Sequence, residues 1–225
     1  MRAFVRLPRL VCGGKLCYTA GMNTNYQLLT DRCIASLTGR PSLLLHSCCG
    51  PCSSYVLEYL TQYFDVTVLY YNPNIRPQAE YEKRLYWLRR VLEGMGLAES
   101  VPLIAEPWRA EDFSSAVTGL EAEPEGGKRC GICIGLRMEE TARRARDAGF
   151  ACFCTTLSVS PHKNAALINT LGAQLEAKYG VTWLPSDFKK RGGFLRSTQI
   201  CKELGIYRQG WCGCTPREPD ETQSL

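Results

Sequence analysis

Short apolar runs alternate along this chain with longer segments of helical periodicity, and this alternation constrains the fold more than any other feature. Four short runs are predicted as strands, at 42–47, 65–72, 101–104 and 151–158. Helices are predicted at 25–39, 53–63, 79–93, 109–120, 133–148 and after PHKN as far as Lys178. Strands and helices alternating at this spacing predict βαβ crossovers, and therefore a three-layer α/β fold with helices on both faces of a parallel sheet. From Val181 onward the C-terminal segment is predicted to be loop-rich, with basic patches.

The composition is that of a folded domain with a sizeable core. Of the 225 residues, 45% are hydrophobic, so the chain does not depend on cross-links for its stability. No segment reaches the roughly 18–20 continuous apolar residues of a membrane helix, and we expect no membrane among its partners. The net charge of +5 leans only weakly toward an anionic partner.

The first 21 residues lack obvious periodicity, whereas Met22 begins a more ordinary polar segment. They contain basic residues but no clean apolar stretch before a small-residue cleavage site, which argues against a secretory signal. We expect residues 1–21 to be a non-native or disordered extension from a wrongly chosen start codon. Residues 22–225 are then predicted to form one α/β catalytic domain.

The chain has thirteen cysteines, an odd number, and seven of them lie in three tight clusters. These are Cys48, Cys49 and Cys52, then Cys130 and Cys133, then Cys212 and Cys214. A disulfide framework is typical of small secreted proteins, whereas this chain is long and rich in core residues. A reducing compartment, the cytoplasm, with metal or redox chemistry is the better interpretation.

The first two clusters each open a predicted helix, where positive helix ends and turn N–H groups favour thiolates over thiols. CCGPC and PHKN both follow predicted strands, and sites in parallel α/β folds form at the carboxyl ends of strands. Three chemistries fit the cysteine spacing. An iron–sulfur cluster needs about four thiolates, which Cys48, Cys49, Cys130 and Cys133 would supply. A four-thiolate zinc site in an RNA-binding protein and a thioredoxin-like thiol–disulfide oxidoreductase using Cys49 and Cys52 are the alternatives.

The remaining cysteines are predicted not to be ligands. Cys152 and Cys154 alternate with Phe153 in an apolar strand, and buried free cysteine is common in protein cores. Four others lie in the doubtful N-terminal segment or in predicted helices without partners: Cys12, Cys17, Cys33 and Cys201.

Six motifs in order extend these observations: SLLLHSCCGPCSS, VLYYNPNIRPQAEYEKR, EPEGGKRCGIC, TTLSVSPHKN, DFKKRGG and YRQGWCGC. From about Met22 to Thr215 the chain resembles the QueH-type epoxyqueuosine reductases. The resemblance implies a fold of the nucleotide-binding (HUP/Rossmann-like) type. It also implies the last step of queuosine synthesis, in which the epoxide oxygen on the cyclopentane ring of epoxyqueuosine is removed at the wobble position of tRNA.

The resemblance further implies a 4Fe–4S cluster with an adjacent metal ion, iron or zinc, and no cobalamin. Cys48, Cys49, Cys130 and Cys133 would hold the cluster. Cys212 and Cys214 would be a redox-active pair or, with Cys52, ligands of the second metal. An external electron donor is needed because the reaction consumes two electrons.

Further residues are assigned by the chemistry of the reaction and its tRNA partner. His162 is the candidate proton donor, since histidine titrates in the useful range. Phosphate contacts are expected from basic residues in or beside the motif loops: Arg76, Arg84, Lys163, Lys189, Lys190 and Arg191. Trp211 is the preferred aromatic for stacking on the unpaired base, ahead of Tyr71 and Tyr207.

Overall fold

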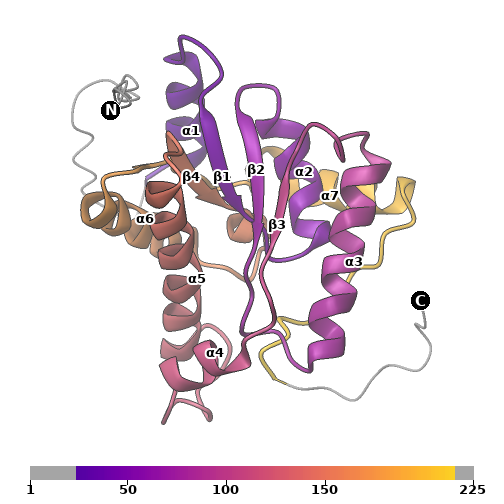
Figure 1. Cartoon of the computed structure of the whole chain (residues 1–225), viewed down its shortest axis with the longest axis vertical. Helices are drawn as coiled ribbons and strands as arrows, with labels where there is room; N and C mark the ends of the chain where they lie inside the picture. The colour runs from indigo at the N-terminus through magenta and orange to yellow at the C-terminus, as the bar shows by residue number, and fades with distance from the viewer. Residues whose placement is uncertain (1–23, 216–225) are drawn as a thin grey trace, which may run out of the picture.

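The computed structural model describes residues 24–215, which contain a five-stranded, all-parallel sheet (Figure 1). The strands are β1 Ser42–His46, β2 Asp65–Tyr70, β3 Leu103–Ala105, β4 Cys152–Thr155 and β5 Thr182–Trp183, in the order β3-β2-β1-β4-β5. The predicted α/β class and its four strands are confirmed. The fourth strand is shorter than predicted because Thr156–Val159 turn into the 3₁₀ helix η1, and the two-residue strand β5 was not predicted.

The described residues form seven α-helices and two short 3₁₀ helices. The α-helices are α1 Tyr26–Ala35, α2 Gly50–Leu60, α3 Gln78–Gly94, α4 Ala110–Ala116, α5 Lys128–Asp147, α6 Ala165–Tyr179 and α7 Gly193–Glu203. The second 3₁₀ helix, η2, is Lys190–Gly192. Helices α2, α3 and α7 pack on one side of the sheet, and α5 and α6 pack together on the other (Figure 1).

Two boundaries differ from the sequence prediction. Helix α5 begins at Lys128, so Cys130 lies on the helix and not in the loop before it. The segment after Val181 is not loop throughout, because α7 forms there. Its buried residues Ile200 and Cys201 lie on a helix packed against α2, an apolar face that the surrounding glycines and basic residues obscure in the sequence.

The direction of chain progress across the sheet reverses after β3. From β1 the chain moves outward to β2 and β3, then returns through α4 and α5 to β4 on the other side of β1. Right-handed crossovers place helices on opposite faces for opposite directions of progress. The carboxyl ends of β1 and β4 therefore diverge into a crevice, the usual place for a site in such a sheet. The strand order agrees with the doubly wound nucleotide-binding fold, although the HUP/Rossmann-like label itself stays a prediction.

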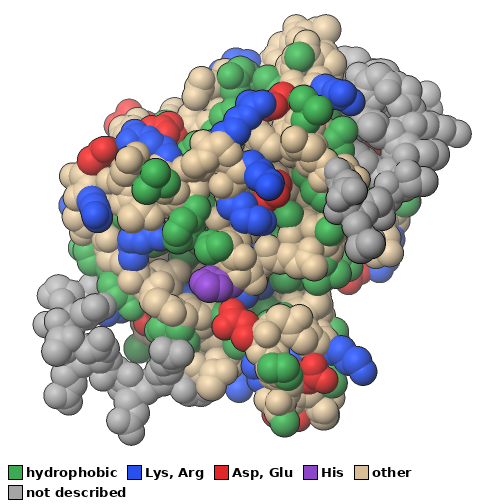
Figure 2. Space-filling model, turned by 180° about the vertical axis from the view of Figure 1, so that it is seen from behind, with side chains coloured by type: hydrophobic (Ala, Val, Ile, Leu, Met, Phe, Trp, Pro, Cys, Tyr) green, Lys and Arg blue, Asp and Glu red, His purple; other side chains and the backbone are tan. Residues whose placement is uncertain are grey.

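Strand β1 lies in the middle of the core. Leu43, Leu44 and Leu45 are at most 1% exposed, because helices cover both faces of a parallel sheet and both faces of its central strands are therefore apolar. Charged side chains are spread over the outer surface with hydrophobic ones between them (Figure 2).

The predicted extension at residues 1–21 lies outside the described residues. Among those that are described, no helix combines the length and the apolar character needed to cross a bilayer.

Gly50 controls how closely α2 approaches α3. A Cβ atom at this position would lie 2.8 Å from the backbone oxygen of Trp87, so the two helices would have to separate.

We expect Gly50→Ala to lower the free energy of unfolding by about 1–3 kcal/mol, measured by urea denaturation of the metal-free protein. Gly135→Ala is the matched control, because no atom lies within 4 Å of its added Cβ. That change should stabilise α5 by up to about 1 kcal/mol. Equal effects of the two substitutions would contradict the packing argument.

Candidate active site

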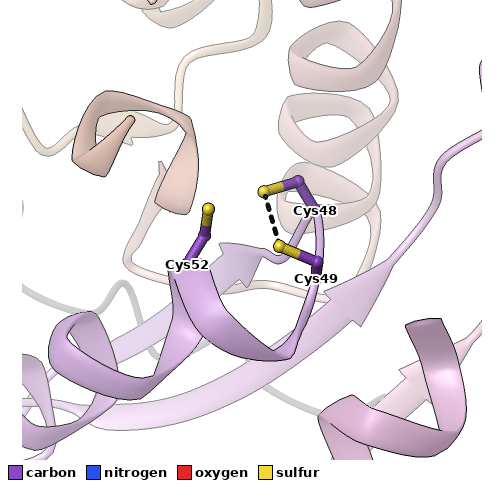
Figure 3. A group of neighbouring side chains, drawn as sticks. All are labelled: Cys48, Cys49 and Cys52. Carbon is purple, nitrogen blue, oxygen red and sulfur yellow. Dashed lines mark hydrogen bonds between the residues drawn. The ribbon is translucent and has the colours of Figure 1, made fainter. Parts of the chain in front are cut away.

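The loop between β1 and α2 brings three cysteines together. Cys49 has extended backbone and caps α2, Pro51 occupies its first turn, and Cys52 follows on that same turn. The sulfur atoms of Cys48, Cys49 and Cys52 all lie within 4.8 Å of one another. The Cys48 and Cys49 sulfurs are 3.7 Å apart, and all three side chains point toward a common centre (Figure 3).

The other two clusters meet at a second place. Cys130 and Cys133 lie in the first turns of α5, and Cys212 and Cys214 lie in the C-terminal loop. All four line one small cavity. The amide of Gly126 donates a hydrogen bond to the Cys130 sulfur at 3.3 Å, so the loop before α5 also supports this cluster.

A larger cavity of about 390 Å³ lies beside the first group of cysteines. It is lined by Cys48, Cys49, Cys52 and Cys212, and by residues from the ends of β2 and β4 and from the C-terminal loop. Arg137, Lys163 and Cys212 line both cavities. The two cavities therefore adjoin, and together they bring all seven clustered cysteines to one site.

Arg84 on α3 holds the C-terminal loop in this position. Its guanidinium donates to the carbonyl oxygens of Cys212 at 2.9 Å and Trp211 at 3.2 Å, and pairs with Glu80 at 2.6 Å. The Gly213 carbonyl accepts a further bond from the amide of Arg76. Arg84 is only 3% exposed and its guanidinium is already bonded within the protein, which disfavours the phosphate contact expected of it.

Arg137 is a buried cation of a different kind. It is 3% exposed, and its Nε donates to the Cys133 carbonyl at 3.0 Å. Among the residues that the structure describes, it forms no ion pair with a carboxylate. A buried charge needs compensation, and the sulfurs that interact with its guanidinium are those of Cys133, Cys212 and Cys48. Of these three, Cys212 has a lowered pKa and supplies the negative charge, whereas the pKa values of Cys133 and Cys48 are raised. The site is therefore suited to carry negative charge on sulfur.

The cysteine pairs divide into thiolates and thiols. The hydrogen bond from Cys214, with the positive charges of Lys163 and Arg137, lowers the pKa of Cys212 to about 5. The Lys163 Nζ lies 3.7 Å from the Cys212 sulfur. Hydrogen bonds from Cys48 and Cys52 hold the pKa of Cys49 well below its usual value. The hydrogen bonds that Cys52 makes with Cys48 and Cys49 raise the pKa of Cys52.

His46 at the end of β1 was not predicted as part of the site. Burial and the nearby charge of Arg137 lower its pKa to about 4, so the ring is neutral. Its two ring nitrogens lie 2.9 Å from the Thr155 hydroxyl and 3.1 Å from the Tyr71 carbonyl. His46 therefore ties together the carboxyl ends of β1, β2 and β4, on which the site is built.

The structure brings together some of the predicted residues and separates others. His162, Lys163 and Trp211 line the larger cavity. Lys189, Lys190 and Arg191 lie outside both cavities, where Lys189 pairs with Asp187 and Arg191 with Asp31. The other two stacking candidates are held elsewhere, since Tyr71 is 7% exposed and bonded to Asp112, and the Tyr207 ring packs against Trp87.

Polar residues of the cavity wall that were not predicted from the sequence include Asn72, Asn74 and Arg137. The asparagines follow the carboxyl end of β2, which is the signal that would have identified them. Arg137 stands four residues after Cys133, and this spacing places two helical residues on one face.

Comparison with known proteins gives one consistent family. The family model of epoxyqueuosine reductase QueH matches residues 43–218, which include all seven clustered cysteines. The protein of that name from Streptococcus pyogenes serotype M1 is 41% identical over 204 residues, 87% of this chain and 80% of the relative. Those from Staphylococcus epidermidis and Thermotoga maritima are 42% and 37% identical over 179 residues each. These matches cover 78% and 77% of this chain, and 75% and 88% of the relatives.

The lowered pKa of Cys212 makes it a reactive thiol of the metal-free protein at neutral pH, because the thiolate is the nucleophile. Cys49 also has a lowered pKa, but it is only 1% exposed. Alkylation of Cys212 by iodoacetamide should rise with pH through a midpoint near pH 5. Lys163→Met removes the adjacent cation and should move that midpoint to between about pH 6 and pH 8. Mass spectrometry of the Cys212 peptide between about pH 4 and pH 9 measures both, with Lys178→Met as the control. A wild-type midpoint at the ordinary cysteine value would contradict the geometry.

Proposed function

The chain belongs to the epoxyqueuosine reductase QueH family, and from this membership we propose that it deoxygenates epoxyqueuosine to queuosine at the wobble position of tRNA. Both C–O bonds of the epoxide break, a carbon–carbon double bond forms, and the oxygen leaves as water with two electrons and two protons supplied. The observation that carries the proposal is the convergence of seven cysteines from three distant segments beside a cavity of about 390 Å³. That volume is within the range of small-molecule sites.

The cysteine donors fit a 4Fe–4S cluster. Such clusters are held by thiolates, and three sulfurs already lie within 4.8 Å of one another. The buried cation of Arg137, which has no carboxylate partner among residues 24–215, acts on one of them, the sulfur of Cys48. We assign Cys48, Cys49, Cys130 and Cys133 as the ligands. When bound, the cluster supplies electrons one at a time.

The position of Cys52 favours a second assignment. Its sulfur belongs to the same three-sulfur group as Cys48 and Cys49, whereas Cys130 and Cys133 line the neighbouring cavity with Cys212 and Cys214. In this alternative, Cys52 is a cluster ligand, and the second cavity is the site of the adjacent metal ion, iron or zinc. Metal analysis of single cysteine variants separates the two assignments.

Cys212 and Cys214 are proposed as a redox-active pair or as ligands of the second metal ion, together with Cys52. The raised pKa of Cys214 and the lowered pKa of Cys212 support the redox-active pair, since a thiolate beside a thiol is the form that begins thiol–disulfide exchange. Oxidation of this thiolate and thiol to a disulfide releases the two electrons that the reaction requires, but only one proton. The second proton therefore comes from another donor at the cavity. An external donor then has to reduce the disulfide after each turnover.

Two side chains at the cavity can deliver protons. His162 is exposed and lines the larger cavity, and we propose it as the proton donor. Lys163 lies deeper. Burial opposes its charge, but the Cys212 thiolate outweighs this effect and raises its pKa, so Lys163 stays cationic and stabilises negative charge that develops on the leaving oxygen.

Single cysteine-to-serine variants test the cluster and its ligands. Anaerobically reconstituted wild-type protein should contain about four irons and four sulfides in the cluster and should deoxygenate epoxyqueuosine in tRNA. Cys49→Ser should lose both the iron and the activity. Loss of the cluster in Cys130→Ser but not in Cys52→Ser supports the first assignment, and the reverse supports the second. Cys154→Ala is the control, because this fully buried residue lies in the core on β4. Wild-type protein that fails to retain iron after reconstitution would overturn the proposal.

The tRNA contacts are proposed on the surface beside the larger cavity. Lys190 is exposed and takes part in none of the ion pairs within the described range 24–215, whereas Lys189 and Arg191 each have an acidic partner. Trp211 lines the cavity and remains the proposed stacking residue for the base. Lys and Arg side chains also lie around an exposed histidine on the face drawn in Figure 2.

Lys190→Ala should weaken binding to tRNAs of any nucleotide sequence, because a phosphate contact does not depend on the base. It should also reduce the slope of log affinity against log salt concentration by about one. Fluorescence anisotropy titrations between about 50 and 200 mM salt measure this slope. Lys178→Ala is the matched control, since Lys178 is equally exposed but lies at the far end of α6 and pairs with Glu139. An unchanged slope for Lys190→Ala would exclude a phosphate contact there.

We also propose that the enzyme acts in the cytoplasm. The cysteines of the described residues form no disulfide with one another, which is the state expected in a reducing compartment.

A further inference from the structure

The larger cavity combines several cations with polar acceptors that have no donor among the described residues. Its cations are Arg84, Arg137, Lys163 and Arg208. Asn74 and Gln209 line it, and their buried carboxamide oxygens accept no hydrogen bond from any residue between 24 and 215. An anionic ligand would satisfy the cations but not these oxygens.

Asn72 and Asn74 stand on a turn directly after β2. The amide of Ile75 closes this turn by donating to the Asn72 carbonyl at 3.1 Å, and Pro73 fixes the backbone in between. Trp108 donates to the Ile75 carbonyl at 2.9 Å, which holds the far side of the turn. The asparagines are therefore presented by a rigid segment.

The two asparagines differ in how they are held. The Nδ2 of Asn72 donates to the Ser47 carbonyl at 2.8 Å, which fixes the orientation of its amide, and its oxygen lies beside the His46 ring. Asn74 is 1% exposed, and its side chain forms no hydrogen bond with any described residue. A buried amide oxygen without a donor is rare in native proteins and destabilises the fold. Asn74 therefore contributes nothing to the folded state that would explain its place in the wall.

We propose that the Asn74 carboxamide accepts a hydrogen bond from a hydroxyl or N–H group on the substituent that carries the epoxide. This inference rests on the proposed function and makes Asn74 a residue that determines substrate specificity. In the proposed function, the Lys163 ammonium stabilises the leaving epoxide oxygen, which accepts hydrogen bonds. The donors of the same substituent need an acceptor, and the amide oxygen supplies it without the cost of burying a further charge. A site built to bond a donor discriminates strongly against ligands that lack it.

The test uses the reconstituted full-length chain and Asn74→Leu, which keeps the size of the side chain and removes its oxygen. We expect kcat/KM for tRNA carrying epoxyqueuosine to fall about 10- to 100-fold, with the iron content unchanged. The urea midpoint of the variant should equal or exceed that of the wild type, because an unpaired buried polar group is lost. Asn74→Asp keeps an acceptor and should retain more activity than Asn74→Leu. Tyr26→Phe is the control, since it also removes a buried, unpartnered polar atom, but outside this cavity.

Binding separates failure of this inference from failure of the proposed function. The affinities of wild type and Asn74→Leu are compared for anticodon stem–loops with epoxyqueuosine and with unmodified guanine, a measurement that requires no turnover. The preference for the modified stem–loop should fall in the variant. The inference is overturned by an unchanged preference, by loss of iron, which would make Asn74 a metal ligand, or by unfolding, which would make it structural. Absence of deoxygenation by iron-loaded wild type would instead refute the proposed function.

Discussion

The site depends on one feature of the sheet, the order of its strands. Successive strands are added on one side of β1 as far as β3 and on its other side from β4. Because β4 returns to the side of β1 opposite β2, the loops after β1 and β4 are neighbours although more than a hundred residues separate them. The CCGPC loop and the Lys163 segment therefore face the same crevice. The crossover that makes the return also contains α5, whose first turns present Cys130 and Cys133 at the same edge. One topological rule thus explains how residues from distant parts of the sequence share a site.

Charge balance explains how Cys49 and Cys212 are held as thiolates beside cysteines that stay protonated. Arg84, Arg137 and Lys163 approach the sulfurs from α3, α5 and the loop after β4, respectively. The first has a carboxylate partner in Glu80, while Arg137 has none among residues 24–215. A buried guanidinium of this kind is stable only next to negative groups. The same electrostatics that favours thiolates also makes the cavity receptive to an oxygen atom that gains negative charge.

Much of the fold could be predicted from the sequence because local signals and global topology agree. The run SLLLHS reads as a central strand, and both of its faces are indeed buried. The strand β5 was missed because two residues carry no periodicity. A helix was expected at Cys201, but the extent of α7 was missed because its apolar face lies among glycines and basic residues. Its place is decided by tertiary packing against α2.

For the site, the sequence identified the cysteines but not the groups that position them. The spacing of CCGPC and CGIC is a strong local signal, and the structure brings Cys48, Cys49 and Cys52 together. The roles of Arg84 and Arg137 depend on contacts across more than a hundred residues or on burial, neither of which a single sequence displays. A single sequence also does not show that Asn74 is buried and that its carboxamide oxygen accepts no hydrogen bond from the described residues.

The bonds from Arg84 and Arg76 to the CGC loop have a consequence for biosynthesis. The last strand of the sheet ends at Trp183, whereas Cys212 follows 29 residues later in the chain. Domains begin to fold from the N-terminal side while the ribosome is still elongating the chain. The sheet and the CCGPC corner can therefore form on the nascent chain before the CGC cysteines have emerged. The sheet can thus form before the site receives its last two cysteines, Cys212 and Cys214. Completion of the cysteine site is therefore a late event in the synthesis of the enzyme.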